Sequence, residues 1–334
     1  MTRPAYFLTD GWAAGRPTSI PGMLQGGSLG AMRTISNLVQ QALVHLGTAA
    51  AFWLGWRDGV TWVDISAMVL FYAMVGMGVS LGLHRLFSHQ SFRPQPWLHA
   101  LLAVLASMAM QGSPARWATD HQRHHACSDR AGDPHSPLVD PFGRPMSRWR
   151  GLYHAHWGWM FNGVVTDKAV YGQAIWGNRV LRFVSNTHYV WIAMVFALAW
   201  TWGKLLGGSD RAAFSAMLWG ACVPAFLLMH GVLSATSIAH CLGRQDFATG
   251  DASRNNWFVV LLTFGDGWHN THHMFPRSAR HGLLPGHLDF AGRVIELLEK
   301  AGLVRGVVRV PGSLIRRSAI GRGGGVRIDP PTDA

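Results

Sequence analysis

Three groups of histidines have a spacing that could bring several imidazoles to one place. Residues 121–125 read HQRHH and residues 269–273 read HNTHH, so both groups hold histidines at positions i, i+3 and i+4. A third group, HRLFSH, contains His84 and His89. On a helix these three positions share a face, so each HxxHH group can present two or three ring nitrogens to one place.

The chemistry that suits such groups is metal binding. The chain has 18 histidines, and the eight in these groups exceed the capacity of one ion, which predicts two metals. Zinc accepts imidazole alone, but structural zinc sites prefer four ligands that often include Cys. Redox-active iron accepts an imidazole-rich shell, and paired irons suit oxygen activation. A continuous α-helix would rotate His84 away from His89, so we expect either a frayed helix there or two different metals.

Apolar helices are the elements that must position these histidines. The chain has 334 residues, of which 49% are hydrophobic and 14% charged, with 16 Trp and 14 Met, which is typical of a membrane protein. Four stretches approach the length of about 20 residues that a bilayer-spanning helix needs. They are residues 39–56, 62–82, 187–206 and 212–235. Short turns, RDGVT and GGSDR, join them in pairs. The predicted fold is therefore an all-α integral membrane protein of four transmembrane helices in two hairpins, with a helical cap that holds the histidines.

The charge distribution predicts on which side the cap lies. Of the 29 Lys and Arg residues, only Arg57, Lys204 and Arg211 lie at the two turns. The positive-inside rule then places the remaining segments, and all histidine groups, on the cytoplasmic face. A fifth apolar run, 97–111, is too short to cross and is expected to lie in the interface or against the bundle. The net charge of +12 fits a surface against anionic lipid, and no nucleic-acid motif accompanies it.

The chain divides into three predicted parts. Residues 1–38 form a cytoplasmic N-terminal segment, residues 39–311 form the membrane domain, and the Gly-, Arg- and Pro-rich tail 312–334 is expected to be disordered. The three cysteines are far apart and form no CxxC motif. Their spacing excludes a disulfide framework and a built-in iron–sulfur cluster.

The histidine groups and their flanks resemble a known family. HRLFSH, HQRHH and HNTHH, in this order around two hairpins, are similar to the three histidine boxes of the membrane fatty acyl desaturases, and more narrowly of the stearoyl-CoA (delta-9) type. The flanking stretches GLHRLFSHQSF, WATDHQRHHACSDRAGDPHSP, HWGWMF and GDGWHNTHHMFPRSARHG agree. The resemblance covers residues 40–300. It implies an enzyme that uses O2 and two iron ions to insert a cis double bond, most narrowly at delta-9, into a saturated acyl chain.

The same resemblance implies roles for individual residues. A ninth ligand follows the fourth span, where TSIAHCLG contains His240. The implied metal ligands are His84, His89, His121, His124, His125, His240, His269, His272 and His273. Residues expected to orient the ligands are Asp120, Thr236, Asp266 and Asn270, and Asp129 and Asp133 also flank the second box. The candidates for an acyl tunnel are Trp117, Gly78, Gly82 and Trp268, for which ordinary helix packing is the alternative. The family usually has Asn at position 236 and Glu at position 266, so this chain departs from it at both.

The electrons for such a reaction must come from another protein. The chain has no CxxC redox site, no Gly-rich dinucleotide loop and no cytochrome signature, so a separate ferredoxin, rubredoxin or b-type cytochrome with its reductase is implied. Basic residues on the cytoplasmic side would attract an acidic donor or a CoA phosphate. They are Arg144, Arg148, Arg150, Lys168, Arg277 and Arg280. The segment 138–153 is longer than the family's usual connector and is expected to touch the substrate or the donor. The acyl carrier stays open among CoA, acyl carrier protein and membrane lipid.

Two other functions compete with desaturation. A diiron hydroxylase of alkyl or lipid chains would use the same oxidant, and only box spacing and flanks favour desaturation over it. A metal transporter or a histidine-rich metal sensor would be a different class. Transport needs ligands along the spans, where His45 and His230 are the main histidines, so this alternative is disfavoured.

Overall fold

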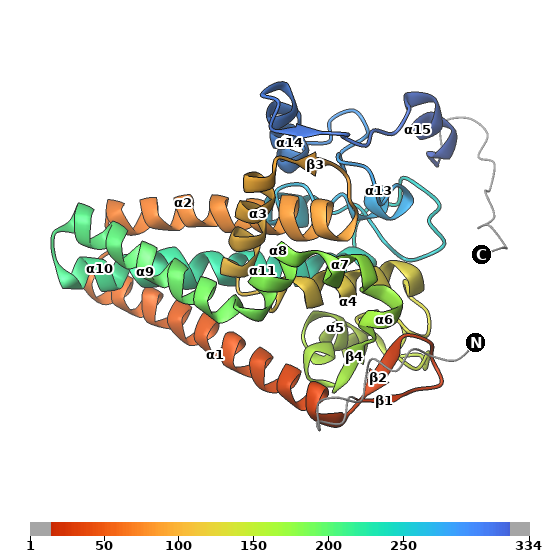
Figure 1. The fold of residues 1–334 in the computed structure, drawn as a ribbon, viewed down its shortest axis with the longest axis horizontal. Coiled ribbons are helices and arrows are strands. Elements are labelled where there is room, and N and C mark those ends of the chain that lie inside the picture. The colour runs from red at the N-terminus through yellow and green to blue at the C-terminus, as the bar shows by residue number, and fades with distance from the viewer. Residues whose placement is uncertain (1–14, 321–334) are drawn as a thin grey trace.

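Long helices form one half of the molecule, and short helices with loops form the other half (Figure 1). The computed structural model describes residues 15–320. The long helices are α1 (Gly27–Asp58), α2 (Trp62–Met77), α9 (His188–Gly207), α10 (Asp210–Met217) and α11 (Val223–Thr236). A π-helix, Leu218–Cys222, makes α10 and α11 one continuous rod. Figure 1 shows that α1–α2 and α9–α11 are hairpins whose turns lie at the same end of the molecule, as the sequence predicts.

Local signals fix both hairpin turns. At the start of α2, the Thr61 hydroxyl accepts a hydrogen bond from the backbone of Asp64, whose carboxylate accepts from the backbone of Thr61, so the two residues form a capping box. At the other turn, α9 ends at Gly208, whose φ of 68° lies in the left-handed region that glycine adopts without strain. Ser209 then caps α10 through Ala212.

Within the described part of the chain, three helical segments are long and apolar enough to cross a membrane. They are Trp62–Ser88, His188–Gly207 and Asp210–His240, which contain or closely match three of the four predicted spans. The remaining predicted span, 39–56, lies inside α1, which has 32 residues but a less apolar sequence. Polar side chains such as Gln40 interrupt it, and Gln40 is buried against the bundle. The fourth span therefore stays a prediction.

A π-helix, Gly78–Ser88, prolongs α2 into the cap. Helix α3 (Pro96–Met108) packs across it. A Cβ on Gly78 would lie 2.4 Å from the backbone carbon of Leu105, and one on Gly82 would lie 2.9 Å from the carbonyl oxygen of Leu102. These glycines therefore allow two helix backbones to touch. The 13-residue α3 covers the fifth apolar run and packs against the bundle, one of its two expected positions.

The cap is assembled from short elements between and after the hairpins. Its helices are α4 (Pro114–Cys127), α5 (Arg148–His156), α6 (Lys168–Tyr171), α7 (Gln173–Gly177), α8 (Arg179–Asn186), α12 (Trp257–Leu262), α13 (His269–Met274) and α14 (Phe290–Lys300). Two small antiparallel sheets tie distant segments together, in the strand orders β1-β2-β4 and β3-β5. The strands are β1 (Arg16–Pro17), β2 (Met23–Gln25), β3 (Arg93–Pro94), β4 (Val164–Thr166) and β5 (Val304–Arg305).

The predicted disordered tail begins with an ordered helix. Residues Gly312–Ser318 form α15, and Ala319 makes a β-bridge with Phe247. The expectation of disorder is wrong for these residues, because their backbone finds partners in the cap. Residues 321–334, and residues 1–14 of the predicted N-terminal segment, lie outside the described residues.

Candidate metal centre

The nine predicted ligands gather at the cap end of the bundle in two adjoining groups. The five-histidine group contains His84, His89, His121, His125 and His272, and the four-histidine group contains His124, His240, His269 and His273. Within each group, one nitrogen from every ring lies within 4.8 Å of the others. Apart from His125 and His273, which are partly exposed, these residues are buried. Segments from four parts of the chain therefore converge as the sequence predicts.

Each HxxHH motif contributes to both groups, in opposite proportions. On α4, His121 and His125 join the five-histidine group while His124 joins the four-histidine group. On α13, His269 and His273 join the four-histidine group while His272 joins the other. Positions i and i+4 lie on one side of a helical face and i+3 on the other side. The two short helices thus hold the two groups side by side, which refines the prediction that each motif serves one place.

The π-helix explains how His84 and His89 reach one group. In a π-helix each backbone N–H bonds to the carbonyl five residues earlier, and the N–H of His89 bonds to the carbonyl of His84 at 3.3 Å. Residues five apart therefore share a face, which they do not on an α-helix. The expectation of a frayed helix or of two different metals is wrong at this position. It holds only for an α-helix, in which residues five apart point to different faces.

The nitrogen atoms within each group are arranged for a cation. The Nδ1 of His84 faces a carboxylate oxygen of Asp266 at 3.1 Å, so Nδ1 carries the proton of the neutral ring and Nε2 has a free lone pair. This Nε2 lies 2.9 Å from the Nε2 of His272, which lies 2.9 Å from the Nε2 of His125. One proton on His272 cannot serve both neighbours. Converging lone pairs without enough protons fit a bound metal ion.

The four-histidine group shows the same arrangement. The Nδ1 of His124 bonds to Asp133 at 3.0 Å, while within the described part of the chain its buried Nε2 has no hydrogen-bond partner. The Nδ1 of His273 bonds to Asp251 at 2.6 Å, and its Nε2 is likewise unpaired. A buried polar nitrogen without a partner costs free energy. A metal ion held by these nitrogens would remove that cost, so the residues present fit the predicted metals.

The two groups differ in how many carboxylates contact their rings. In the four-histidine group, Asp129 bonds to the Nδ1 of His240 at 2.8 Å, and Asp133 and Asp251 hold two further rings. In the five-histidine group, Asp266 is the only carboxylate of the described residues that contacts a ring, that of His84. Such contacts fix the tautomer and raise the basicity of a ligating imidazole. Asp129, Asp133 and Asp266 were expected near the boxes, whereas Asp251 has no sequence signal and is revealed only by the fold.

Proton affinity separates His124 from His121, His125 and His272. Burial, reinforced by the neighbouring rings, lowers the pKa of His121, His125 and His272 well below the ordinary value of 6.5. Burial alone would also lower the pKa of His124, but the Asp133 carboxylate raises it above its ordinary value. In return, His124 holds the pKa of Asp133 well below its usual range, although burial acts against this. The rings of His121, His125 and His272 are therefore neutral at physiological pH and free to bind a cation.

Asp266 has a second task that the sequence did not predict. Its carboxylate bonds to Ser80 at 2.8 Å and pairs with the buried guanidinium of Arg85. Arg85 also pairs with Asp289 at 3.0 Å. A tenth histidine, His281, lies 3.3 Å from Asp266, and its ring centre is 4.4 Å from that of His272. This buried network fixes the far side of the five-histidine group.

The other residues predicted to orient ligands have different contacts. Asp120 pairs with Arg33 at 3.3 Å and accepts a hydrogen bond from Thr166. Asn270 bonds to the backbone of residues 246 and 247, which anchors α13. Thr236 donates to the carbonyl oxygens of residues 155 and 233. Within residues 15–320, none of the three forms a hydrogen bond or ion pair with a histidine of either group, so their part is to position the surrounding chain.

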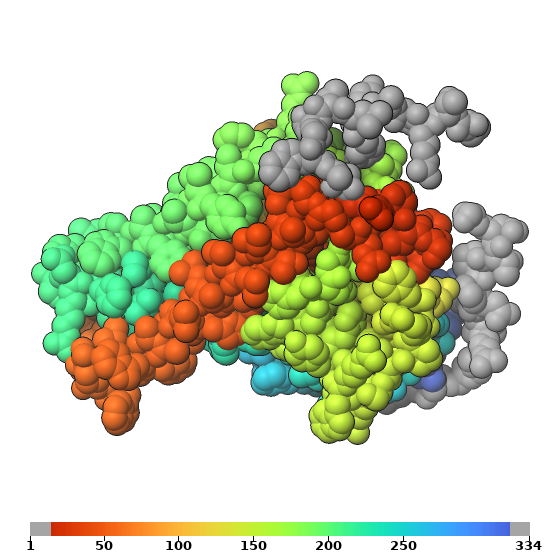
Figure 2. Space-filling view, turned by 90° about the horizontal axis from the view of Figure 1, so that it is seen from below, coloured from red at the N-terminus to blue at the C-terminus, as the bar shows by residue number. Residues whose placement is uncertain are grey.

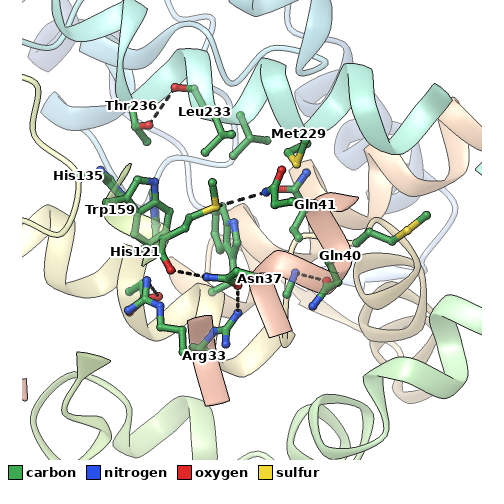
Figure 3. A pocket seen from close by; sticks show the side chains of 18 residues that line it. Arg33, Asn37, Gln40, Gln41, His121, His135, Trp159, Met229, Leu233 and Thr236 are labelled. Carbon is green, nitrogen blue, oxygen red and sulfur yellow. Dashed lines mark hydrogen bonds and ion pairs between the residues drawn. The ribbon is translucent and has the colours of Figure 1, made fainter. Parts of the chain in front are cut away.

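A cavity of about 70 Å³ adjoins the five-histidine group (Figure 3). His121 forms part of its wall, together with Trp117, which stacks on the His121 ring at 5.0 Å. Met229, Leu233 and Thr236 line it from α11, as Figure 3 shows. Polar side chains of α1 close its other side, namely Arg33, Asn37, Gln40 and Gln41. This cavity is a space beside the five-histidine group in which a substrate carbon could lie.

Of the four tunnel candidates, only Trp117 lines this cavity. Gly78 and Gly82 pack against α3, as described above. Trp268 is buried and stacks on His287, with ring centres 3.5 Å apart. Close packing, the alternative considered for these residues, therefore accounts for the contacts of the three.

A separate set of histidines lies inside the bundle. The Nε2 of His45 is 3.2 Å from the Nε2 of His230, whose Nδ1 is 3.0 Å from the Nε2 of His156. Backbone carbonyls end this chain of contacts: His45 bonds to the carbonyl of Gln41, and His156 bonds to Ser237, whose hydroxyl donates to Leu233. Three neutral rings carry three protons for these four contacts, so no proton remains for the contact between His45 and His230. The three rings form a single cluster and not a row of ligands along the spans.

Comparisons with known proteins agree with the geometry. Residues 60–293 match the family model described as fatty acid desaturase. A hex-5-enoyl-[acyl-carrier protein] acetylenase of Moorena producens is 34% identical over 274 residues, which cover 82% of this chain and 85% of that protein. An acyl-CoA C20 Delta5-desaturase of Anemone leveillei is 32% identical, over 77% of each chain. An sn-1 stearoyl-lipid 9-desaturase of Anabaena variabilis is 30% identical, over 79% of this chain and 90% of its own.

Proposed function

This chain belongs to the fatty acid desaturase family and is an oxidoreductase, and from that premise we propose that it inserts a cis double bond into a saturated fatty acyl chain with O2. The observation that carries the proposal is the pair of adjoining histidine groups with converging ring nitrogens. We place the bond at the delta-9 position, which is supported by the box flanks and by the similarity to the stearoyl-lipid 9-desaturase.

The two histidine groups would hold two iron ions. One ion would bind the five-histidine group and the other the four-histidine group. The chemistry that such a pair supplies is the oxidation of an unactivated methylene with O2, which no side-chain acid or base can perform because that C–H bond is not acidic. The net reaction takes two hydrogens from the chain and two electrons and two protons from outside, and forms two waters.

The surrounding residues position the reacting groups. Asp129, Asp133 and Asp251 fix three rings of one group, and Asp266 fixes one ring of the other. Trp117 stacks on His121 and thereby holds a wall of the cavity in place. The cavity would fix which carbons of the acyl chain lie beside the metals, and its burial would exclude water from them.

The remaining parts of the proposal concern place and partners. The apolar helices support a multi-pass membrane protein whose metal centre is on the cytoplasmic face, where most basic residues lie. A separate electron donor, of the ferredoxin, rubredoxin or b-type cytochrome class, would dock there. The long 138–153 segment carries exposed Arg148, Trp149 and Arg150 and is a proposed contact for an acidic donor.

Expression in a host that lacks its own desaturase tests the function directly. Gas chromatography of the cellular fatty acids should show a new monoene when the iron-loaded protein and a competent donor are present. A hydroxylated chain without an olefin would instead identify the protein as a hydroxylase. Absence of both products, with the protein present in the membrane, would contradict the proposal.

A further inference from the structure

A groove on the outside of the bundle meets the cavity beside the metal centre. It has a volume of about 470 Å³, within the range of small-molecule sites. Helices α1 and α4, the start of α9 and the segment 165–168 line it. Arg33, Arg116 and Asp120 line both this groove and the buried cavity. The groove and the cavity therefore adjoin at these three side chains, and the cavity in turn touches His121.

The outer wall of the groove belongs to a face suited to lipid. Met32 and Ile35 line the groove and are 59% and 62% exposed, and Leu38 and Val39 continue the exposed apolar stripe along α1. The stripe runs on into the predicted span at Leu46. Figure 2 shows α1 crossing this face obliquely, in red to orange, with the green α9 beside it. Side chains of this size need a lipid environment or a partner to leave water.

Helix α8 sets the depth of the groove relative to the bilayer. It lies between two groove-lining segments, at Trp176 and at His188–Tyr189. Its Phe183 is 61% exposed, and Arg179 and Arg182 beside it are also exposed. Exposed aromatic and basic side chains on one short amphipathic helix are the pattern of an element that lies in the headgroup region. With α8 in the headgroup region, the groove would open at the boundary between acyl chains and headgroups.

The inner end of the groove is positively charged. The guanidinium of Arg33 is buried, pairs with Asp120 and bonds to the carbonyl of Val164. Its Nε has no partner within the described residues. Arg116 adds a second cation, bonded to Asn37 at 2.9 Å. Asp120 pairs with Arg33, and within the described residues no carboxylate forms an ion pair with Arg116, which leaves donors for an ester carbonyl or a phosphate.

We propose that the substrate enters sideways from the bilayer as an acyl chain esterified to a membrane glycerolipid, with its ester at Arg33 and Arg116 and its chain in the cavity. This inference rests on the proposed function. The apolar wall at Met32 and Ile35 would receive the lipid chain from the membrane, whereas Asp167 and Lys168 on the cap side would face the headgroup. A soluble thioester would gain nothing from a wall that opens to lipid.

The test uses the purified full-length protein, loaded with iron, in vesicles of phosphatidylcholine and phosphatidylglycerol whose chains are saturated. Reduced ferredoxin and its reductase supply electrons. Stearoyl-CoA and stearoyl-acyl carrier protein are offered in parallel reactions with vesicles made of ether lipids, whose alkyl chains hydrolysis does not release as fatty acids. No acyltransferase is present, so each carrier keeps its own chain. Phospholipid and thioester fractions are hydrolysed separately and analysed by gas chromatography.

The proposal expects monoene in the phospholipid fraction and none on either thioester. Met32→Trp, which narrows the groove, should reduce that product about tenfold, equivalent to about 1.4 kcal/mol. The matched control Leu38→Trp changes an exposed residue of the same helix outside the groove and should leave the rate unchanged. Monoene on a thioester while the phospholipid stays saturated would overturn the carrier and keep the proposed function. Equal rates for the two variants would contradict entry of the substrate through the groove. Absence of product in every reaction would contradict the proposed desaturase function itself.

Discussion

The two histidine groups differ in what lies behind their imidazoles. The five-histidine group has more ring nitrogens but only one carboxylate, and Asp266 shares its charge with Arg85. The four-histidine group has fewer rings, and three carboxylates hold three of the four. We infer that the five-histidine group would bind its metal through the number of its imidazoles. The four-histidine group would bind its metal through fewer imidazoles, whose carboxylate partners supply negative charge. Carboxylate-backed imidazoles are the more basic ligands, so two irons at these sites would not be equivalent.

Removing a ligand from either group should have the largest effect. His272→Ala and His124→Ala each take a ring from a different group, and each should abolish monoene formation while the protein stays in the membrane. Iron analysis should find about one iron per chain in each variant, since the other group keeps all its rings. His99→Ala, which changes a histidine outside both groups, is the control. Retained turnover in either variant would remove that histidine from the ligand set.

Asp133→Asn should have the next largest effect, confined to the four-histidine group. The amide keeps the size of the side chain but loses the charge that orients His124, and losses of this kind cost about 10–100-fold in metal affinity. Competition with a chelator measures this, and excess iron should restore activity. Asp140→Asn is the matched control, because Asp140 pairs with Arg144 instead of a histidine. Equal weakening by both variants would show that the carboxylate acts only through the fold.

Asp266→Asn should weaken iron binding less, by under about tenfold, because the other four rings of its group have no carboxylate partner. It should lower the melting temperature, since the buried Arg85 would keep only Asp289 as its charged partner. Thermal unfolding and chelator competition on the same sample separate the two effects. If iron affinity fell as far as in Asp133→Asn, the contrast between the groups would be wrong.

The pH dependence of the metal-free protein should show the smallest effect. The pKa values of His121, His125 and His272 are lowered by folding, so the unfolded state binds more protons and stability falls as pH drops below 6.5. His124 has the opposite sign, because its raised pKa gives stability below 6.5 that is lost as pH rises. The melting temperature should therefore fall by a few degrees from pH 7.5 to 5.5. His125→Gln should flatten this slope, whereas an unchanged slope would contradict the assigned protonation states.

Sequence patterns predicted which histidines come together better than how they are arranged. Helical spacing pointed to the two HxxHH motifs, and only family resemblance pointed to His240, which has no partner nearby in sequence. The π-helix that brings His84 and His89 together was not predicted, because residues five apart point to different faces of an ordinary α-helix. Asp251 was missed because it reaches His273 from a separate loop. The fourth span stays a prediction. Helix α1 buries polar side chains inside the bundle, and these lower its mean hydropathy although they do not face the lipid side.

The central claim is that nine histidines hold two non-equivalent irons side by side. The most direct test is the iron content of the purified protein together with its Mössbauer spectrum. The structure predicts two irons per chain and two distinct iron signals of equal area, of which Asp133→Asn changes only one. A single iron per chain, zinc in place of iron, or two signals altered equally by that variant would contradict it.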